Sequence, residues 1–211
     1  MGLPAVTQRL VLASANPSKV AELQDLLDAS GLDVEVLARP DGLVVIEDAP
    51  DFVGNARLKA DAVAAATGEW ALSDDSGLVV DALDGAPGVL SARFSGVGAT
   101  DESNVSLLLD RLGAIGAVSP EDRTARFRCA IVIVSPADAD SRSIELVAEG
   151  SVEGRIIERR RGGNGFGYDP VFVPVEGDGR TFAEMSSVEK HELSHRGRAL
   201  RALLPRLAAA I

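Results

Sequence analysis

The sequence is poor in cysteine, in histidine and in positive charge, and these shortages exclude several classes of protein. A single cysteine, Cys129, excludes an internal disulfide framework, so a reducing cytosol is the expected compartment. Lysine and arginine number 21 against 32 aspartates and glutamates, a net charge of −11. That excess disfavours binding of a nucleic acid polymer over a wide face, but it permits a small anionic ligand at a local basic site.

Long apolar runs are also missing. The longest, Ala130–Val134 and Leu203–Ile211, are too short to span a bilayer. Residues 1–12 lack the charged start and long apolar stretch of a secretory signal. We therefore expect a cytoplasmic protein without a membrane partner. Its 211 residues, 46% of them hydrophobic and 25% charged, suffice for one globular domain with a buried core.

The order of predicted elements favours an α/β or α+β fold with a mixed sheet. Helix and strand alternate in the first third of the chain, and hairpins dominate later. The pattern predicts strands over 9–13, 32–37, 70–72, 124–135, 143–150 and 171–173, and helices over 17–30, 52–67, 100–112 and 196–207. An ordered loop is predicted over 84–98, a turn over 136–141 and a glycine-rich loop over 161–167.

The first chemistry-bearing cluster, Ser14-Ala15-Asn16-Pro17-Ser18-Lys19, lies between a predicted strand and a predicted helix. Backbone N–H groups and the helix dipole make such a position suitable for an anion, and Lys19 adds a full charge. Ser14 and Asn16 can donate hydrogen bonds to phosphate oxygens. The alternative is a capped helix with a solvated lysine, which this cluster taken alone favours because such helix starts are common.

The second cluster, Ser73-Asp74-Asp75-Ser76-Gly77, follows a short apolar strand. Adjacent carboxylates there can bind Mg²⁺, and one of them can deprotonate a water molecule. Neighbours on a strand face opposite sides, so Asp74 and Asp75 are expected to differ in role. A turn is an equal alternative, since these residue types favour turns. Glu47 and Lys59 can join this site, although each alone is typical of a solvated charge.

The third cluster is the loop Gly162–Pro170, with four glycines in six residues. Glycine allows a ligand to approach the backbone closely. Phe166 and Tyr168 can stack on a planar base, and Asp169 can pair with donors on that base. The alternative is a flexible turn with an aromatic anchor. Binding is favoured, because aromatic residues make up only 4% of the chain and two of them lie here.

The fourth cluster combines Lys190 with Ser194-His195-Arg196-Gly197. Ser194 suits the N-cap of the last helix, which places His195 and Arg196 in its first turn. The helix dipole disfavours cations there, so an anionic or carbonyl-bearing ligand would relieve the mismatch. A surface-exposed basic turn explains the same residues equally well.

Six ordered blocks run from residue 14 to about residue 200. They are Ser14-x-Asn16-x-x-Lys19, Asn55-Ala56-x-x-Lys59-Ala60, Ser73-Asp74-Asp75-Ser76-Gly77-Leu78, Gly85-Ala86-Pro87-Gly88-x-x-Ser91-Ala92-Arg93, Gly165-Phe166-Gly167-Tyr168-Asp169-Pro170 and Glu189-Lys190-x-x-x-Ser194-His195-Arg196. Together they resemble the inosine triphosphate pyrophosphatases, which hydrolyse non-standard purine nucleoside triphosphates.

This resemblance implies a fold, an activity and a cofactor. The fold is an elongated mixed α/β structure in which helices flank a central sheet, with two lobes and the nucleotide in a cleft between them. One domain would cover residues 1–211. The activity is Mg²⁺-dependent cleavage of ITP, dITP or XTP between the α- and β-phosphates, which gives the nucleoside monophosphate and pyrophosphate and cleans the nucleotide pool. A homodimer is implied as well.

The resemblance also implies site residues. Asp75 would be the proton acceptor and a metal ligand, and Glu47 the second metal carboxylate. The residues implied to hold the triphosphate are Ser14, Asn16, Lys19 and Lys59, with Ser76 beside it. Those implied to surround the base are Phe166, Gly167, Tyr168, Asp169, Lys190, His195 and Arg196.

One segment departs from the family pattern. The family commonly has E-x-G-x-T-F-x-E-N-A, and this chain has Glu47-Asp48-Ala49-Pro50-Asp51-Phe52-Val53-Gly54-Asn55-Ala56. Asp51 replaces the usual Thr and Gly54 replaces the second Glu. The departure shifts the expected metal binding toward Asp74 and Asp75.

Two alternatives stay open. One is a related pyrophosphatase acting on modified pyrimidine or common nucleoside triphosphates, and the other is a nucleotide-binding module without turnover. Carboxylates near a phosphate site favour catalysis, because a pure anion binder gains nothing from them.

Overall fold

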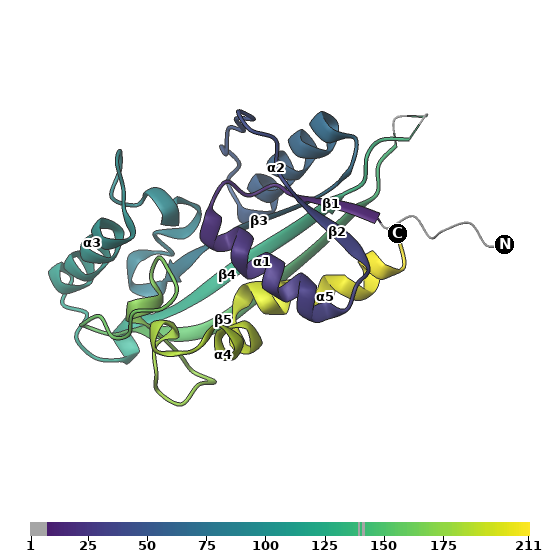
Figure 1. Cartoon of the computed structure of the whole chain (residues 1–211). Helices are drawn as coiled ribbons and strands as arrows, with labels where there is room; N and C mark the ends of the chain where they lie inside the picture. Colours follow the sequence, from purple (N-terminus) through teal and green to yellow (C-terminus); the bar gives the residue numbers. More distant parts are fainter. Residues whose placement is uncertain (1–7, 139, 141) are drawn as a thin grey trace. The chain divides into compact units, whose positions relative to one another are not determined.

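The chain forms one six-stranded mixed sheet with helices packed on it (Figure 1). The computed structural model describes residues 8–138, 140 and 142–211. The expectation about residues 1–12 and the predicted turn over 136–141 therefore fall partly outside the described residues. The elements are β1 (Gln8–Leu12), α1 (Pro17–Ser30), β2 (Val34–Ala38), α2 (Phe52–Thr67), β3 (Trp70–Val80), α3 (Asp101–Ala114), β4 (Thr124–Val134), β5 (Glu145–Ile156), β6 (Phe172–Pro174), α4 (Ser187–Leu193) and α5 (His195–Ala208).

Two compact units share these elements. Unit 1 comprises Met1–Asp75, Ala130–Ala148 and Leu200–Ile211, and unit 2 comprises Ser76–Cys129 and Glu149–Ala199. The strand order is β2-β1-β3-β4-β5-β6, and β3, β4 and β5 contribute residues to both units. Among the described residues, no helix is long and apolar enough to cross a bilayer.

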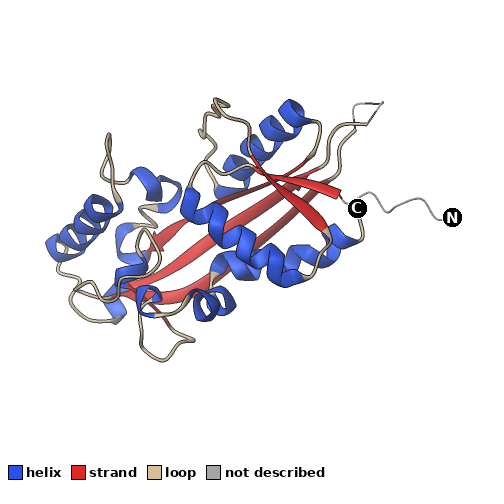
Figure 2. Cartoon of the chain, in the orientation of Figure 1, coloured by secondary structure: helices blue, strands red, loops and turns tan. Residues whose placement is uncertain are grey.

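In unit 1, strand β1 pairs in parallel with β2 on one side and with β3 on the other. Helix α1 joins β1 to β2, and α2 joins β2 to β3 (Figure 2). The two connections run in opposite directions across the sheet. Because parallel crossovers are right-handed, α1 and α2 cover opposite faces (Figure 1). The strand order thus reverses beside β1, and ligands of open α/β sheets bind outside the carboxyl ends of strands at such a reversal.

Helix α2 is rich in alanine and packs closely on the sheet. Its Ala56, Ala60 and Val63 are fully buried against a cluster that includes Val11 of β1 and Ala71 of β3. Small side chains let the helix approach the strands, so the long side chains that it carries can reach residues of β3. The predicted bounds of this helix, 52–67, agree with the structure.

Unit 2 has its own aromatic core. Phe127 of β4 packs edge-on against Phe172 of β6 with ring centroids 4.7 Å apart, and its ring lies parallel to that of His195 at 4.8 Å. Leu108 of α3 and Phe182 complete the fully buried centre. Helix α3 begins with a reciprocal capping box between Thr100 and Ser103.

Several sequence-based boundaries were wrong. Strand β3 has 11 residues, so Ser73-Asp74-Asp75-Ser76-Gly77 lies inside a strand and the turn alternative is wrong. Strand β5 is also longer than predicted, and α4 was missed because it has only 7 residues. The predicted N-cap role of Ser194 is confirmed, since its hydroxyl accepts a hydrogen bond from the backbone N–H of Gly197 at 3.1 Å.

Gly150 allows α5 to lie directly on β5. A Cβ at this position would clash with the carbonyl oxygen of His195, and it would lie 2.6 Å from the backbone nitrogen of Ala199. Both obstacles are backbone atoms, which cannot rotate away. The glycine therefore sets how closely the start of α5, with the site residues on it, approaches the sheet.

We predict that Gly150→Ala lowers the free energy of unfolding by about 1–3 kcal/mol, the usual cost of overpacking. Urea denaturation measures this loss. Gly163→Ala is the matched control, because a Cβ there meets nothing within 4 Å, and it should change stability by less than about 0.5 kcal/mol. Equal effects of the two substitutions would show that the close approach at Gly150 is not a constraint.

Candidate functional site

The first cluster lies at the carboxyl end of β1, where the strand order of unit 1 reverses. Asn16 is the N-cap of α1, and its side-chain oxygen accepts from the backbone nitrogens of Ser18 at 2.9 Å and Lys19 at 3.3 Å. The hydroxyl of Ser14 accepts from the backbone nitrogen of Asn16 at 3.2 Å. The capped-helix interpretation is confirmed for these atoms. The cap also fixes the turn from which Lys19 extends.

Asp74 and Asp75 have different partners because they alternate along β3. Asp74 is fully buried and lies 3.2 Å from the ammonium group of Lys19 on α1. Asp75 is 8% exposed and lies 3.5 Å from the ammonium group of Lys59 on α2. One strand thus presents a carboxylate to each of the two helices, as the alternation predicts.

Lys59 is a buried cation shared by two carboxylates. Only 7% of the residue is exposed, and its ammonium group donates to Glu47 at 2.8 Å as well as to Asp75. Burial by itself lowers the pKa of Lys59. Nearby carboxylates, Asp75 first among them, outweigh burial and raise that pKa, so the ammonium group stays charged. The solvated-lysine interpretation is wrong for this residue.

Asp75 is also perturbed by its surroundings. Burial raises the pKa of its carboxyl group above the ordinary value, while the ammonium groups of Lys59 and Lys19 oppose the shift. A carboxylate that is desolvated but still faces cations is a stronger base than an exposed one. This combination suits a group that takes a proton from water.

Asn55 is a site residue to which the sequence assigned no role. It is 1% exposed, and its side-chain amide donates to Asp75 at 3.2 Å while its oxygen accepts from the backbone nitrogen of Ala49 at 3.0 Å. Asn55 therefore ties the segment that carries Glu47 to the carboxylate of Asp75. The available signal was its position four residues before Lys59, which places both on one face of α2.

Ala49 departs from the pattern as well as Asp51 and Gly54, and Gly54 leaves room for the methyl group of Ala49. A Cβ at Gly54 would lie 2.6 Å from the Cβ of Ala49 and 3.1 Å from the carboxylate of Asp51. Ala49 stands where the family commonly has glycine, and Gly54 where it commonly has glutamate. The methyl group of Ala49 therefore takes the space that a side chain at position 54 would need. Asp51 keeps the helix capped by accepting from the nitrogen of Gly54 at 2.7 Å.

The carboxylates of unit 1 suit a hard divalent cation with several waters. Among the described residues, no three His, Cys, Asp or Glu side chains gather closely enough to hold a metal ion. Glu47 and Asp75, however, both contact the same positive group, the ammonium of Lys59. Mg²⁺ prefers oxygen ligands and commonly binds through one or two carboxylates plus water, so this pair fits it. Asp74 forms an ion pair with Lys19 at 3.2 Å, and its predicted role as a metal ligand stays a prediction.

The glycine loop of unit 2 is organised by Asp169. This carboxylate is 3% exposed, accepts from the backbone nitrogen of Phe166 at 2.9 Å and forms an ion pair with Lys190 at 2.6 Å. Gly165 has a φ of +73°, and a Cβ there would clash with the same carboxylate. Asp169 therefore shapes the loop from within and anchors Lys190 beneath it.

Phe166 is the aromatic side chain that the loop presents beside cations. The ammonium group of Lys190 lies 4.8 Å from its ring centroid and the guanidinium of Arg196 lies 5.8 Å away. Arg196, 1% exposed, also donates to the hydroxyl of Ser76 at 2.9 Å. An aromatic face with neighbouring N–H donors can stack on a planar base and hydrogen-bond its edge.

The other residues assigned to the base have structural contacts. Tyr168 is buried in the core of unit 2 and donates its hydroxyl to the carbonyl of Ser91 at 2.9 Å. Burial raises the pKa of Tyr168 well above its usual range. The backbone nitrogen of Gly167 donates to Asp101 at 2.7 Å. His195 is stacked on Phe127 and 4% exposed. These side chains position the loop and the start of α5.

Comparisons with known proteins agree on one family. The model of the Ham1 family matches residues 10–206. A protein of Frankia alni named dITP/XTP pyrophosphatase is 47% identical over 92% of this chain and 95% of its own length. One of the same name from Nostoc sp. is 46% identical over 97% and 96%. A HAM1 protein structure from Coxiella burnetii, 40% identical, superimposes with a TM-score of 0.80 over 96% of this chain and 99% of that chain.

The contact between Ala49 and Gly54 predicts a background-dependent effect on stability. In the natural chain, Gly54→Ala should lower the free energy of unfolding by about 1–3 kcal/mol because of the clash. In an Ala49→Gly background only the Asp51 carboxylate remains close to the added Cβ, at 3.1 Å. Gly54→Ala should then cost clearly less, since the helix propensity of alanine also offsets part of the loss. A double-mutant cycle in urea measures the coupling. The same loss in both backgrounds would show that Ala49 does not determine the effect.

Proposed function

The chain belongs to the Ham1 family, and we propose on that basis that it is a nucleoside-triphosphate pyrophosphatase. It would hydrolyse non-standard purine nucleoside triphosphates, ITP, dITP and XTP, to the nucleoside monophosphate and pyrophosphate. The main support within the chain is the contact of buried Lys59 with buried Asp75 and partly exposed Glu47, in which a base, a cation and a second carboxylate meet.

Lys19 and Lys59 would bind the phosphates. A triphosphate carries about four negative charges near neutral pH, so its binding needs several cations. Lys19 extends from the first turn of α1 and Lys59 from the middle of α2, and each forms an ion pair with an aspartate of β3. Ser14 and Asn16 would add hydrogen bonds at the N-terminus of α1, where the helix dipole favours an anion.

Glu47 and Asp75 would hold Mg²⁺, because their carboxylate oxygens are the ligands that this ion prefers. When bound, the ion would neutralise phosphate oxygens and stabilise the charge that develops on the departing pyrophosphate. Asn55 would hold the two carboxylates in position relative to each other, because it contacts Asp75 and also Ala49, two residues after Glu47.

Asp75 would act as the proton acceptor. The α-phosphorus must be attacked by water, and a base that removes a proton from that water makes it a better nucleophile. Burial makes Asp75 the stronger base, and Asn55 orients one of its oxygens at 3.2 Å. The oxygen of the water would bond to phosphorus as the bond to the β-phosphate oxygen breaks.

Phe166, Lys190 and Arg196 of unit 2 would recognise the base. The ring of Phe166 would stack on the purine, and Lys190 and Arg196 would supply N–H donors beside it. Hypoxanthine and xanthine carry a 6-oxo group that accepts hydrogen bonds, whereas the 6-amino group of adenine donates them. A donor set therefore favours the 6-oxo purines and leaves adenine with an unpaired group. A homodimer in the cytoplasm stays a prediction.

Hydrolysis rates over a panel of nucleotides test the substrate assignment. With Mg²⁺ and pyrophosphate release as the readout, kcat/KM for ITP, dITP and XTP should exceed that for ATP by a factor on the order of 100, the discrimination expected from buried polar groups left unpaired. A dUTP arm tests the pyrimidine alternative. Equal values for ATP and ITP would reject the assignment, and omission of the metal should abolish turnover.

Asp75→Asn tests the role of the base. The change preserves shape but removes the proton acceptor, so kcat for ITP should fall by a factor of about 100 or more, while ITP still binds in equilibrium dialysis. Asp48→Asn is the matched control. This substitution removes the same charge next to Glu47, but Asp48 is exposed. A normal kcat in Asp75→Asn would eliminate Asp75 as the base.

A further inference from the structure

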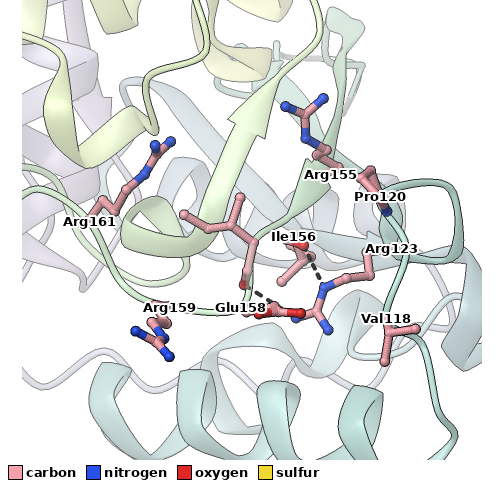
Figure 3. A pocket seen from close by; sticks show the side chains of 9 residues that line it. Val118, Pro120, Arg123, Arg155, Ile156, Glu158, Arg159 and Arg161 are labelled. Carbon is pink, nitrogen blue, oxygen red and sulfur yellow. Dashed lines mark hydrogen bonds between the residues drawn. The ribbon is translucent and has the colours of Figure 1, made fainter.

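A further cationic site lies in unit 2. Its residues belong neither to the proposed phosphate and metal site nor to the proposed base site. It is a cavity of about 320 Å³ between the start of β4 and the end of β5 (Figure 3). The lining residues are Val118, Pro120, Arg123, Arg155, Ile156, Ile157, Glu158, Arg159 and Arg161. Four of these side chains are positive and one is negative, in a chain whose net charge is −11. None of them has a role in the proposed hydrolysis.

Arg123 is a buried charge at this cavity. It is 5% exposed, and its guanidinium donates to the backbone carbonyls of Ile156 at 2.7 Å, Ala117 at 2.9 Å and Ile157 at 3.2 Å. Among the described residues, no carboxylate lies within ion-pair distance of it. Burial lowers the pKa of Arg123, and the charge of Glu158 acts against that effect. The three carbonyls accept hydrogen bonds from each of its nitrogens but do not neutralise its charge.

Three more arginines surround the same space. Arg155 and Arg159 are exposed, and neither forms an ion pair with any residue that the structure describes. Arg161 is held at the rim by a hydrogen bond to the carbonyl of Gly179 at 2.7 Å and by an ion pair with Glu184 at 3.4 Å, so its charge is already partly neutralised. In Figure 3, Arg123 and Arg155 lie on the right of the view, and Arg159 and Arg161 lie on the left. The lining therefore takes positive charge from the segment before β4, from the end of β5 and from the segment after it.

We propose that this cavity binds a diphosphate group, either as free pyrophosphate or as the end of a nucleoside diphosphate. Guanidinium groups are planar forks that match phosphate oxygens, and several of them are typical of phosphate recognition. The volume lies at the lower end of small-molecule pockets, and apolar side chains line part of it. This ligand would supply the negative charge that Arg123 lacks.

Glu158 opposes this binding. Within the part of the chain that the structure describes, it is the one carboxylate in the lining, and it neutralises part of the positive charge. Its replacement by glutamine should therefore strengthen diphosphate binding, which is the opposite of what the replacement of a rim arginine should do. Opposite effects of the Glu158 and arginine substitutions on the Kd would distinguish a specific site from general attraction of anions.

Calorimetric titration of the full chain tests the proposal. Lys19→Ala and EDTA are used throughout to suppress binding at the proposed catalytic cluster, and pyrophosphate and ADP are titrated separately. Arg155→Gln and Arg159→Gln should each raise the Kd about tenfold, or about 1.4 kcal/mol, and Glu158→Gln should lower it. Binding of both ligands would support a diphosphate end, and binding of pyrophosphate alone would support the free anion.

Arg160→Gln is the matched control. Arg160 is the next residue in the chain and makes the same charge change, but it is bonded to the carbonyl of Glu102 and the hydroxyl of Ser106, both at 3.0 Å, and does not line the cavity. Its Kd should stay within about twofold of the parent, less than the 1.4 kcal/mol of a tenfold change. Equal weakening by Arg159→Gln and Arg160→Gln, or no binding of either ligand, would overturn the proposal.

ITP hydrolysis with Mg²⁺ should be unchanged in Arg155→Gln and Arg159→Gln made without the Lys19 substitution.

Discussion

The shared ammonium group of Lys59 is the interaction on which the chemistry of unit 1 depends. Two carboxylates that approach the same point repel each other unless a cation lies between them. Lys59 supplies that cation to Glu47 and Asp75. It reaches them because the alanine face of α2 packs flat on the sheet. The fold thus keeps Glu47 and Asp75 assembled around one positive charge.

The reversal of strand order beside β1 explains why the functional side chains of unit 1 meet. It sends α1 to one face of the sheet and α2 to the other. The alternation along β3 then gives Asp74 to the first helix and Asp75 to the second. Two consecutive residues can therefore be divided between anchoring Lys19 and serving as a base. The sequence, in which Asp74 and Asp75 are neighbours, does not show which helix each of them contacts.

Much of the fold was predictable because its signals are local. The caps and apolar periodicity of α1 and α2 placed both helices closely, and Asn16-Pro17 marked the start of α1. The length of β3 was not predictable, since Ser73 to Gly77 have turn-forming side chains that only tertiary partners hold in a strand. The sequence motifs placed Glu47, Lys59 and Asp75 in one predicted site, and the side chains of these residues do contact one another through Lys59. The links made by Asn55 to Ala49 and Asp75 depend on contacts between distant segments, and no periodicity reveals them.

The packing of Ala49 against Gly54 makes these two positions interdependent. A side chain at position 54 would place its Cβ 2.6 Å from the methyl group of Ala49 and 3.1 Å from the carboxylate of Asp51. The effect of a substitution at position 54 therefore depends on which residue occupies position 49. For the design of variants, the segment that carries Glu47 and the first turn of α2 have to be treated as one unit.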